Sequence, residues 1–350
     1  MKENVILTDC SVEELSNFLD GINSFGNFNF KCISKISNGP RTGIKSELKR
    51  YSIYFSAAWQ AFKNRKKYNI ILGWQQFYTL IFCFYCNLFN VKKENTVIAL
   101  NFTYKEKPGF LGKIYKWFMK KCISDKYLDF IHVPSNEYAD NINRSFDFQR
   151  ERIIVTTFGV NDIYKEYKDC NPPKGYSKNE YVMSIGRSNR DFDLLIDAWK
   201  DVDIPLIIIS DTFKTTKTLP KNVTLLNNIS GYKQYPYISN AKIAIIPIMD
   251  EKICSGDTVL LTALSFARTV IVTAPSTLSE MYIQDKVNGY LVRKNEKEIA
   301  KLVNEICNGE LPELGEAARK SFLQNFSRYS MGKNITKFIT NQKKKFVKTR

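Results

Sequence analysis

Short runs of consecutive apolar residues alternate with amphipathic stretches along the second half of this 350-residue chain. Residues 207–209 and 243–246 are apolar at successive positions, so both faces of these segments must be buried. Strands of that kind form parallel sheets that helices cover on each side. We therefore predict a doubly wound α/β domain with strands over 181–185, 205–210, 223–226, 242–248, 269–272 and 289–292, and helices over 191–200, 258–267 and 296–307.

The first half repeats this rhythm, with expected strands over 5–8, 69–72, 96–101, 130–133 and 153–156. A polar stretch over 167–178 is rich in proline and glycine, which is typical of a hinge between domains. The length suits two domains. The predicted divisions are an N-terminal domain over 1–168, a linker over 169–179, a second domain over 180–315, and a C-terminal helix and basic tail over 316–350 that can cross back to the N-terminal domain.

The chain carries 52 Lys and Arg against 35 Asp and Glu, a formal net charge of +17. The excess is shared: 25 basic and 17 acidic residues give +8 over 1–170, and 27 and 18 give +9 over 171–350, so both halves should attract anions. Eight scattered cysteines and a single histidine predict reduced thiols in the cytoplasm and no metal site. The longest apolar stretch, 77–89, is shorter than the roughly 18–20 residues that cross a bilayer, and the N-terminus does not resemble a secretion signal.

Polar and basic residues follow two of the predicted strands at the carboxyl edge, where doubly wound sheets bind ligands. Gly-Arg-Ser-Asn-Arg spans 186–190 after the first strand of the second domain, and Ser-Gly-Asp-Thr spans 255–258 at the start of a helix. Glycine lets the backbone approach a ligand, the first N–H groups of a helix attract anions, and arginine offers paired donors. This edge is therefore predicted to bind a diphosphate, whereas each residue taken singly would be an ordinary helix cap or surface charge.

The order of these motifs, continued at 263–264, 270–273, 280 and 288–292, resembles the nucleotide-sugar-binding domain of bacterial GT-B glycosyltransferases. It is most similar to their retaining group-1 (family 4) clan, and 133–137 and 159–161 resemble segments that lead to that family's interdomain crossing. The resemblance implies two Rossmann-like domains facing each other across a cleft. It also implies a hexosyltransferase that moves a sugar from a UDP- or GDP-sugar to a lipid-linked or surface polysaccharide, such as lipopolysaccharide or capsule, with retention.

The resemblance also implies roles for individual residues of the donor site. The ribose and sugar contacts would come from Asp257, Thr262 and Glu280. The family usually has two glutamates at the positions that Cys254 and Thr262 occupy here, so this chain is similar to a variant that lacks the pair. The diphosphate contacts would come from Gly186, Arg187, Ser188, Arg190, Ser255, Gly256 and Thr258.

The chemistry implied by this family needs no cofactor and no metal, because arginines and backbone donors stabilise the charge that develops on the leaving diphosphate. No Asp-x-Asp motif is present. An inverting enzyme would need a general base. The sequence does not rank Asp9, Glu106 and Glu137 as bases. The other catalytic candidates are Asn101 and Thr103, which would contact donor or acceptor, and His132, for which a structural role is favoured because it lies one strand later than the family's catalytic histidine.

A segment over 110–121 combines aromatic residues with lysines at helical spacing. Lys113, Lys116 and Lys120 would lie together, with Trp117 and Phe118 at the interface of an anionic membrane. The alternative is a core helix with a solvated lysine face. The tail over 332–350 carries seven basic residues and no acidic ones, which also favours anionic lipid. We therefore expect a cytoplasmic protein bound peripherally to the inner face of the cell membrane.

Other functions remain open at this point. The missing glutamates are compatible with an inactive nucleotide-sugar binder, and a GT-B-type epimerase would want more acid or base groups than a single histidine supplies. A nucleic-acid-binding protein would fit the pI of about 9.3, but no RRM, KH, zinc-finger or helix-turn-helix signature is present and the basic residues are dispersed. Nucleic acid is therefore not an expected partner.

Overall fold

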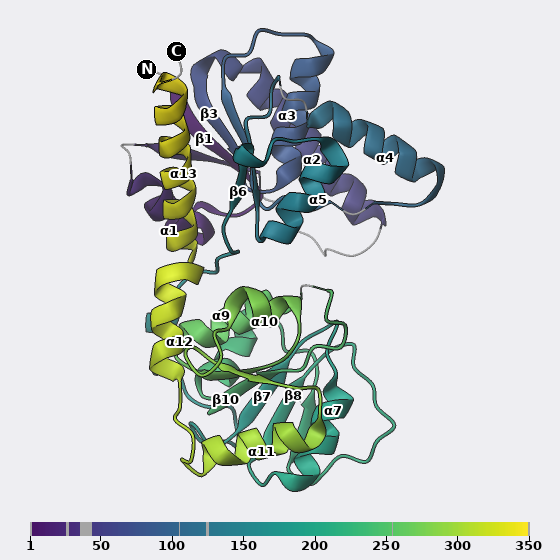
Figure 1. Cartoon of the computed structure of the whole chain (residues 1–350), viewed down its shortest axis with the longest axis vertical. Coiled ribbons are helices and arrows are strands. Elements are labelled where there is room, and N and C mark those ends of the chain that lie inside the picture. Colours follow the sequence, from purple (N-terminus) through teal and green to yellow (C-terminus); the bar gives the residue numbers. More distant parts are fainter. Residues whose placement is uncertain are drawn as a thin grey trace. The chain divides into compact units, whose positions relative to one another are not determined.

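The computed structural model describes residues 2–25, 28–35, 44–104, 106–123, 126–253 and 255–348, and it divides into two compact units (Figure 1). The first unit combines Met1–Asn161 with Arg328–Arg350, and the second is Asp162–Ser327. Each contains a six-stranded sheet in which every pairing of strands is parallel. The predicted doubly wound α/β fold is thus confirmed for both halves.

The expected linker over 169–179 lies within the second unit instead of between the two. Its Tyr176 hydroxyl donates to Thr224 Oγ1 at 2.9 Å, and the Cys170 carbonyl accepts from Asn240 Nδ2 at 3.3 Å. The chain therefore divides before residue 168, at Asn161, because the proline-rich stretch packs onto the second sheet. A stretch rich in proline and glycine marks irregular backbone, which need not be a domain boundary.

The first sheet has the order β2-β1-β3-β4-β5-β6. The sequence analysis missed β2, an edge strand that pairs with β1 alone and buries only its first residue, Phe30. Without a continuous apolar run such a strand has no clear signal. The strands are β1 (Glu3–Thr8), β2 (Phe30–Ser34), β3 (Tyr68–Gly73), β4 (Thr96–Ala99), β5 (Phe130–Val133) and β6 (Ile153–Val155).

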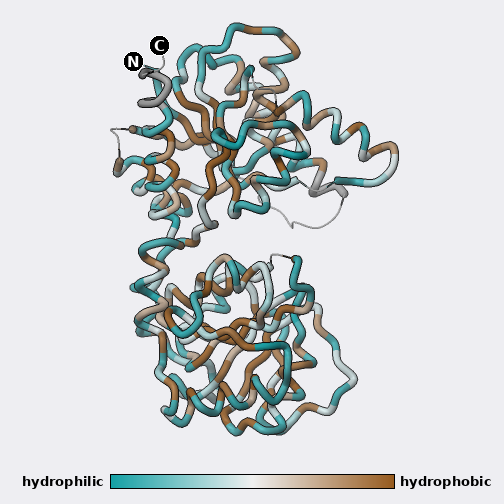
Figure 2. Tube along the Cα trace, viewed as in Figure 1, coloured by the Kyte–Doolittle hydropathy of each residue, from teal (hydrophilic) through white to brown (hydrophobic). Residues whose placement is uncertain are grey.

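Two groups of helices cover the two faces of the first sheet (Figure 1). On one face α1 (Val12–Asn23) packs beside α13 (Arg328–Lys348), the helix that brings the C-terminus back to this unit. The opposite face packs against α2 (Ile44–Lys63), α3 (Gln76–Leu88), α4 (Gly109–Cys122) and α5 (Asn136–Phe146). Figure 2 shows the hydrophobic stretches concentrated on the strands between these layers.

The second sheet has the order β12-β11-β10-β7-β8-β9. Its six strands were all predicted: β7 (Val182–Ile185), β8 (Leu206–Ile209), β9 (Val223–Leu226), β10 (Ile243–Ile246), β11 (Thr269–Thr273) and β12 (Tyr290–Val292). Helices α7 (Phe192–Ala198) and α11 (Glu296–Cys307) bury their apolar sides against one face. The other helices are α6 (Tyr164–Tyr167), α8 (Tyr235–Ser239), α9 (Asp257–Ser265), α10 (Thr277–Tyr282) and α12 (Gly315–Ser321).

Within the described residues, every helix falls short of the length and hydropathy that crossing a membrane would require.

Candidate functional site

The loops that follow β7 and β10 leave the carboxyl edge of the second sheet side by side, because the two strands are neighbours. The N–H of Asp191 donates to the carbonyl of Pro247 at 3.0 Å. Asn189, in the left-handed region at φ +54°, accepts from the N–H of Asp250 at 2.6 Å and donates its side-chain amide to the carbonyl of Asp250 at 3.0 Å. The two loops that the sequence singled out are therefore joined by hydrogen bonds.

Arg190 lies in the middle of this pair of loops and is only 6% exposed. Its Nη1 donates to the carbonyls of Ser188 and Asn189, both at 3.2 Å, and to Ser255 Oγ at 3.4 Å. Two glycines make room for it. A Cβ on Gly186 would lie 2.6 Å from the Arg190 Cγ, and a Cβ on Gly256 would overlap the guanidinium.

The charge of Arg190 is only partly compensated. It makes no ion pair with any residue that the structure describes, and its Nε is buried there without a hydrogen-bond partner. Burial lowers the pKa of Arg190 to about 10, against the opposing field of Asp257. Burial also raises the pKa of the Asp257 carboxyl, although it accepts from the Thr258 N–H at 3.0 Å and feels the guanidinium. A buried cation with an unsatisfied donor, beside the first turn of α9, is suited to an anion.

The other proposed donor-site residues are less closely gathered. Arg187 is exposed and forms an ion pair with Asp211 at 3.0 Å, so its guanidinium is turned toward the loop after β8. The buried Thr262 donates its hydroxyl to the carbonyl of Thr258 at 2.7 Å, within its own helix. Ser188, Thr258 and Glu280 are exposed, the last in the first turn of α10. Cys254 lies outside the described residues.

Two residues that the sequence analysis did not single out also bear on these loops. The backbone N–H of Thr277, at the start of α10, donates to the carbonyl of Glu251 at 2.9 Å. Lys294, which follows β12, donates its Nζ to the carbonyl of Met249 at 2.6 Å and so brings a further cation to the loop after β10. Lys294 could have been predicted, because it closely follows a predicted strand of the same parallel sheet.

His132 has a structural environment in the first unit, as favoured from its position. It is 1% exposed; its Nδ1 accepts from the Asn101 N–H at 3.2 Å and its Nε2 donates to the Thr156 carbonyl at 2.9 Å. Burial lowers the pKa of His132 to about 4. The ring is therefore neutral near pH 7 with both nitrogens used by the backbone, which leaves it unsuited to proton transfer.

Asn101 and Thr103 lie at a cavity that the sequence analysis missed. It has a volume of about 260 Å³ at the carboxyl edge of the first sheet. Next to it Gln75 donates its amide to both carboxylate oxygens of Asp9, at 3.1 and 2.9 Å. Its aromatic walls come from helices, so no strand-end pattern pointed to them. The lining residues are Arg50, Tyr51, Tyr54, Gln75, Gln76, Phe77, Asn101 and Thr103.

The segment expected at a membrane forms α4, and its residues differ in exposure. Lys113, Trp117 and Lys120 are exposed, whereas Lys116 pairs with Glu106 at 2.6 Å. Phe118 is half-buried against the core, with its ring centroid 5.3 Å from that of Phe84, so it is less available to a membrane than the exposed Trp117.

The basic tail continues as α13, whose Met331, Ile335 and Ile339 are buried in the first unit. This helix lies on the face of the first sheet opposite to α4. The side chains of Lys343, Lys344, Lys345 and Lys348, and the whole of Arg350, lie outside the described residues.

Two doubly wound domains, the second with a buried arginine at the carboxyl edge of its sheet, are the architecture of the GT-B fold class. Residues 179–308, which are 130 of the 350 residues, match the family model described as "Glycosyl transferases group 1", and the resemblance read from the sequence is confirmed over this part of the chain.

Solved structures align with nearly the whole chain and confirm the fold. HepE from Anabaena, in complex with UDP, has a TM-score of 0.62 at 12% identity over 97% of this chain and 100% of that chain. Sucrose-phosphate synthase from Thermosynechococcus elongatus has a TM-score of 0.64 at 13% identity, with 97% and 99% covered. The lipopolysaccharide outer core galactosyltransferase WaaB has a TM-score of 0.59 at 14% identity, with 97% and 99% covered.

One curated protein, the FACT complex subunit SSRP1 of Ciona intestinalis, is 28% identical over 116 residues, or 32% of this chain. The chain spans only 16% of that relative's length.

Proposed function

We propose that the protein is a glycosyltransferase that moves a sugar from a UDP- or GDP-sugar to a lipid-linked or surface polysaccharide acceptor, with retention. The observation that carries the proposal is Arg190, a buried arginine whose Nε has no partner among the described residues and which makes no ion pair with them. Removing a cation from water without an anion is costly, so this site is suited to a negatively charged ligand. The match of residues 179–308 to the group 1 family makes a nucleoside diphosphate the ligand of choice.

Transfer breaks the bond between the anomeric carbon and the diphosphate, and negative charge develops on the leaving oxygen. In this proposal Arg190 and the first backbone N–H groups of α9 stabilise that charge, in a setting where donors are already in place. Gly256 contributes by having no side chain between the guanidinium and the helix. Asp257, held by the Thr258 N–H, is left to accept from ribose or sugar hydroxyls.

The cavity of about 260 Å³ in the first unit is the proposed place for a sugar ring of the acceptor. Tyr51 and Phe77 supply aromatic surface, and Gln75, Asn101 and Thr103 supply amide and hydroxyl groups. Sugar rings present C–H faces and hydroxyl edges, which these two kinds of group can contact separately. Two of the similar structures support these substrate classes. HepE was solved in complex with UDP, and WaaB is described as a lipopolysaccharide outer core galactosyltransferase.

A second candidate function is an inactive nucleotide-sugar binder. It is favoured by Thr262, which occupies the position of one family glutamate and uses its hydroxyl within its own helix. Both candidates require the same diphosphate contacts, and only turnover of a nucleotide sugar separates them. Hydrolysis or transfer on a lipid extract would support the enzyme, and stable binding without either would support the inactive binder.

The decisive experiment compares two arginine variants of the second unit by thermal shift with UDP and GDP. Arg190→Ala should lose the nucleotide-dependent rise in Tm, while its Tm without nucleotide stays within a few degrees because an incompletely compensated charge has been removed. Arg268→Ala is the matched control at the opposite edge of the same sheet. Its Nε and Nη1 donate to the Phe266 carbonyl at 2.9 Å and to Asn179 Oδ1 at 2.7 Å.

Arg268→Ala should therefore lower the Tm without nucleotide and keep the nucleotide-dependent rise. If Arg190→Ala still responds to UDP and GDP like the unsubstituted protein, Arg190 does not contact the diphosphate and the proposal fails.

A further inference from the structure

Large apolar side chains, which are normally buried, lie exposed along α2 in the first unit. Leu48, Tyr51, Phe55 and Trp59 recur at a spacing of three or four residues, so they form one stripe along the outer side of the helix. Leu48 alone is 65% exposed. The sequence analysis assigned no role to this helix.

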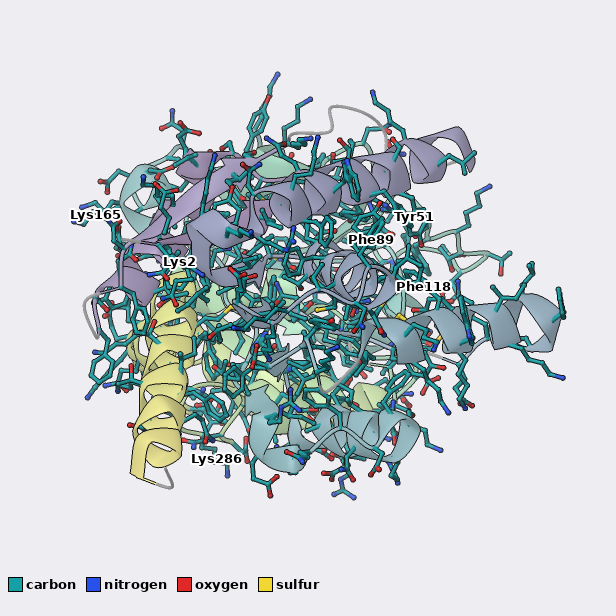
Figure 3. The ribbon with its side chains drawn as sticks, turned by 90° about the horizontal axis from the view of Figure 1, so that it is seen from above. Lys2, Tyr51, Phe89, Phe118, Lys165 and Lys286 are labelled. Atoms are coloured by element: carbon teal, nitrogen blue, oxygen red, sulfur yellow. The ribbon has the colours of Figure 1, made fainter. Side chains whose placement is uncertain are left out.

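Ring contacts connect this stripe with α4 across α3. The ring of Tyr85 lies 6.4 Å from that of Phe55 and 6.3 Å from that of Phe84, measured between centroids, and Phe84 lies 5.3 Å from Phe118. Leu88 and Phe89, at the end of α3, are also exposed. Figure 3 labels one residue near each helix, Tyr51, Phe89 and Phe118, and they lie on the side toward which α4 projects.

Helix α4 also carries exposed apolar side chains. Phe110 and Leu111 are 76% and 77% exposed, and Ile114 and Trp117 follow along the helix. All three helices cover the same face of the first sheet. We name the exposed side chains of α2, the end of α3 and α4 the aromatic band: Leu48, Tyr51, Phe55, Trp59, Leu88, Phe89, Phe110, Leu111, Ile114 and Trp117.

The helices that carry the aromatic band are rich in basic residues. Helices α2, α3 and α4 together contain eight Lys and Arg and one acidic residue, Glu47. Between α4 and α5 a hollow of about 570 Å³ is lined by three cations, one carboxylate and three other side chains: Lys116, Lys120, Arg144, Glu106, Tyr104, Asn141 and Ser145. Glu106 is paired with Lys116, which leaves Lys120 and Arg144 for an anion. Lys120 and Arg144 make no ion pair with the described residues.

We propose that the aromatic band rests on an anionic phospholipid bilayer, with α2 and α4 both in contact and a lipid phosphate held in the hollow between α4 and α5. Aromatic side chains with lysines around them suit the boundary between headgroups and acyl chains, and Lys and Arg attract anionic headgroups. This inference deepens the proposed membrane-bound acceptor and rests on it. It replaces the expected basic tail as the main attachment, because α13 packs on the other face of the sheet.

Vesicle co-sedimentation tests the inference with three substitutions that make the same change on different faces. Leu48→Glu on α2 and Phe110→Glu on α4 should each reduce binding to vesicles of phosphatidylcholine with phosphatidylglycerol by about tenfold, because each puts a carboxylate at the anionic surface. Val12→Glu on α1 is the matched control, since Val12 is 49% exposed on the opposite face. It should bind like the unsubstituted protein.

Loss of binding in Phe110→Glu alone would overturn the shared surface, and loss in neither would overturn the membrane as partner. Equal binding to vesicles without phosphatidylglycerol would contradict the role of charge. For the hollow, Arg144→Ala should weaken the preference for phosphatidylglycerol, and an unchanged preference would remove the phosphate site. The UDP-dependent Tm of each variant should be unchanged, so failure here is distinguishable from failure of the diphosphate site in the second unit.

Discussion

Gly256 carries two constraints at a single backbone position. Its φ of +99° is a conformation that residues with a side chain rarely adopt, and a Cβ there would overlap the Arg190 guanidinium. Gly175 has a similar φ of +88° with nothing within 4 Å of where a Cβ would lie. Substitution at Gly175 therefore tests backbone strain alone, whereas substitution at Gly256 tests strain together with a steric clash with Arg190.

Both Gly256→Ala and Gly175→Ala should lose about 1 kcal/mol of unfolding free energy from the left-handed backbone. Only Gly256→Ala should also lose the UDP-dependent rise in Tm, because the methyl group displaces Arg190. Urea denaturation and thermal shift measure the two effects. Equal nucleotide responses in the two variants would show that the position of Arg190 does not matter for binding.

At the scale of single residues, His132 makes the free energy of unfolding depend on pH. Its pKa is about 4 in the folded protein, below the 6.5 of an exposed histidine, so folding favours the neutral ring. The contribution of the neutral ring to the free energy of unfolding is fully present above pH 6.5. It falls as the pH decreases toward 4, and about 2 kcal/mol is lost at pH 5. Urea denaturation at pH 7 and pH 5 measures this loss.

His132→Gln is the control, because it removes the only histidine of the chain and leaves the carboxylates unchanged. Its stability should fall less between the two pH values than that of the unsubstituted protein. An identical fall in both would mean that His132 does not titrate in this way.

At the scale of elements, α1 and α13 approach so closely that only glycine fits at two positions. A Cβ on Gly21 would overlap the Tyr329 carbonyl oxygen, and one on Gly332 would lie 2.6 Å from the Phe18 carbonyl oxygen. This contact fixes α13 in the first unit, beside the buried Met331 and Ile335.

Gly21→Ala should therefore destabilise the protein by about 2 kcal/mol through overpacking, although the same change in an exposed helix is stabilising. Asp20→Ala, one residue earlier and exposed, is the control and should leave stability nearly unchanged. Chemical denaturation measures both. A Gly21→Ala protein as stable as the unsubstituted one would show that the helices can separate without loss.

What the sequence could predict follows from the kind of signal each element carries. The strands of the second sheet are continuous apolar runs, and in a parallel sheet their ends meet at one edge, so the convergence of residues 186–190 and 255–258 was accessible. The burial of Arg190 could not be predicted, because it depends on Gly186 and Gly256, which lie 70 residues apart in the sequence. The cavity of the first unit was also missed, since its aromatic walls come from α2 and α3.

At the scale of the whole molecule, the net charge of +17 belongs to the first unit, because residues 162–327 carry 21 basic and 21 acidic side chains, and residues 1–161 with 328–350 carry 31 and 14. In the second unit Arg190 is buried near a helix start, where it suits one small anion. In the first unit the cations surround exposed aromatic side chains, which suits an extended anionic surface. Charge alone could not distinguish these two uses, since it depends on which cations are buried and which border apolar groups.

The return of α13 to the first unit also orders events at the ribosome. Residues 162–327 emerge as one uninterrupted stretch and can fold while synthesis continues. The first unit has its six strands earlier but keeps the apolar side of α1 uncovered until α13 is translated. The half of the protein made first is thus expected to be the last to mature, and its nascent form is where a chaperone would be needed.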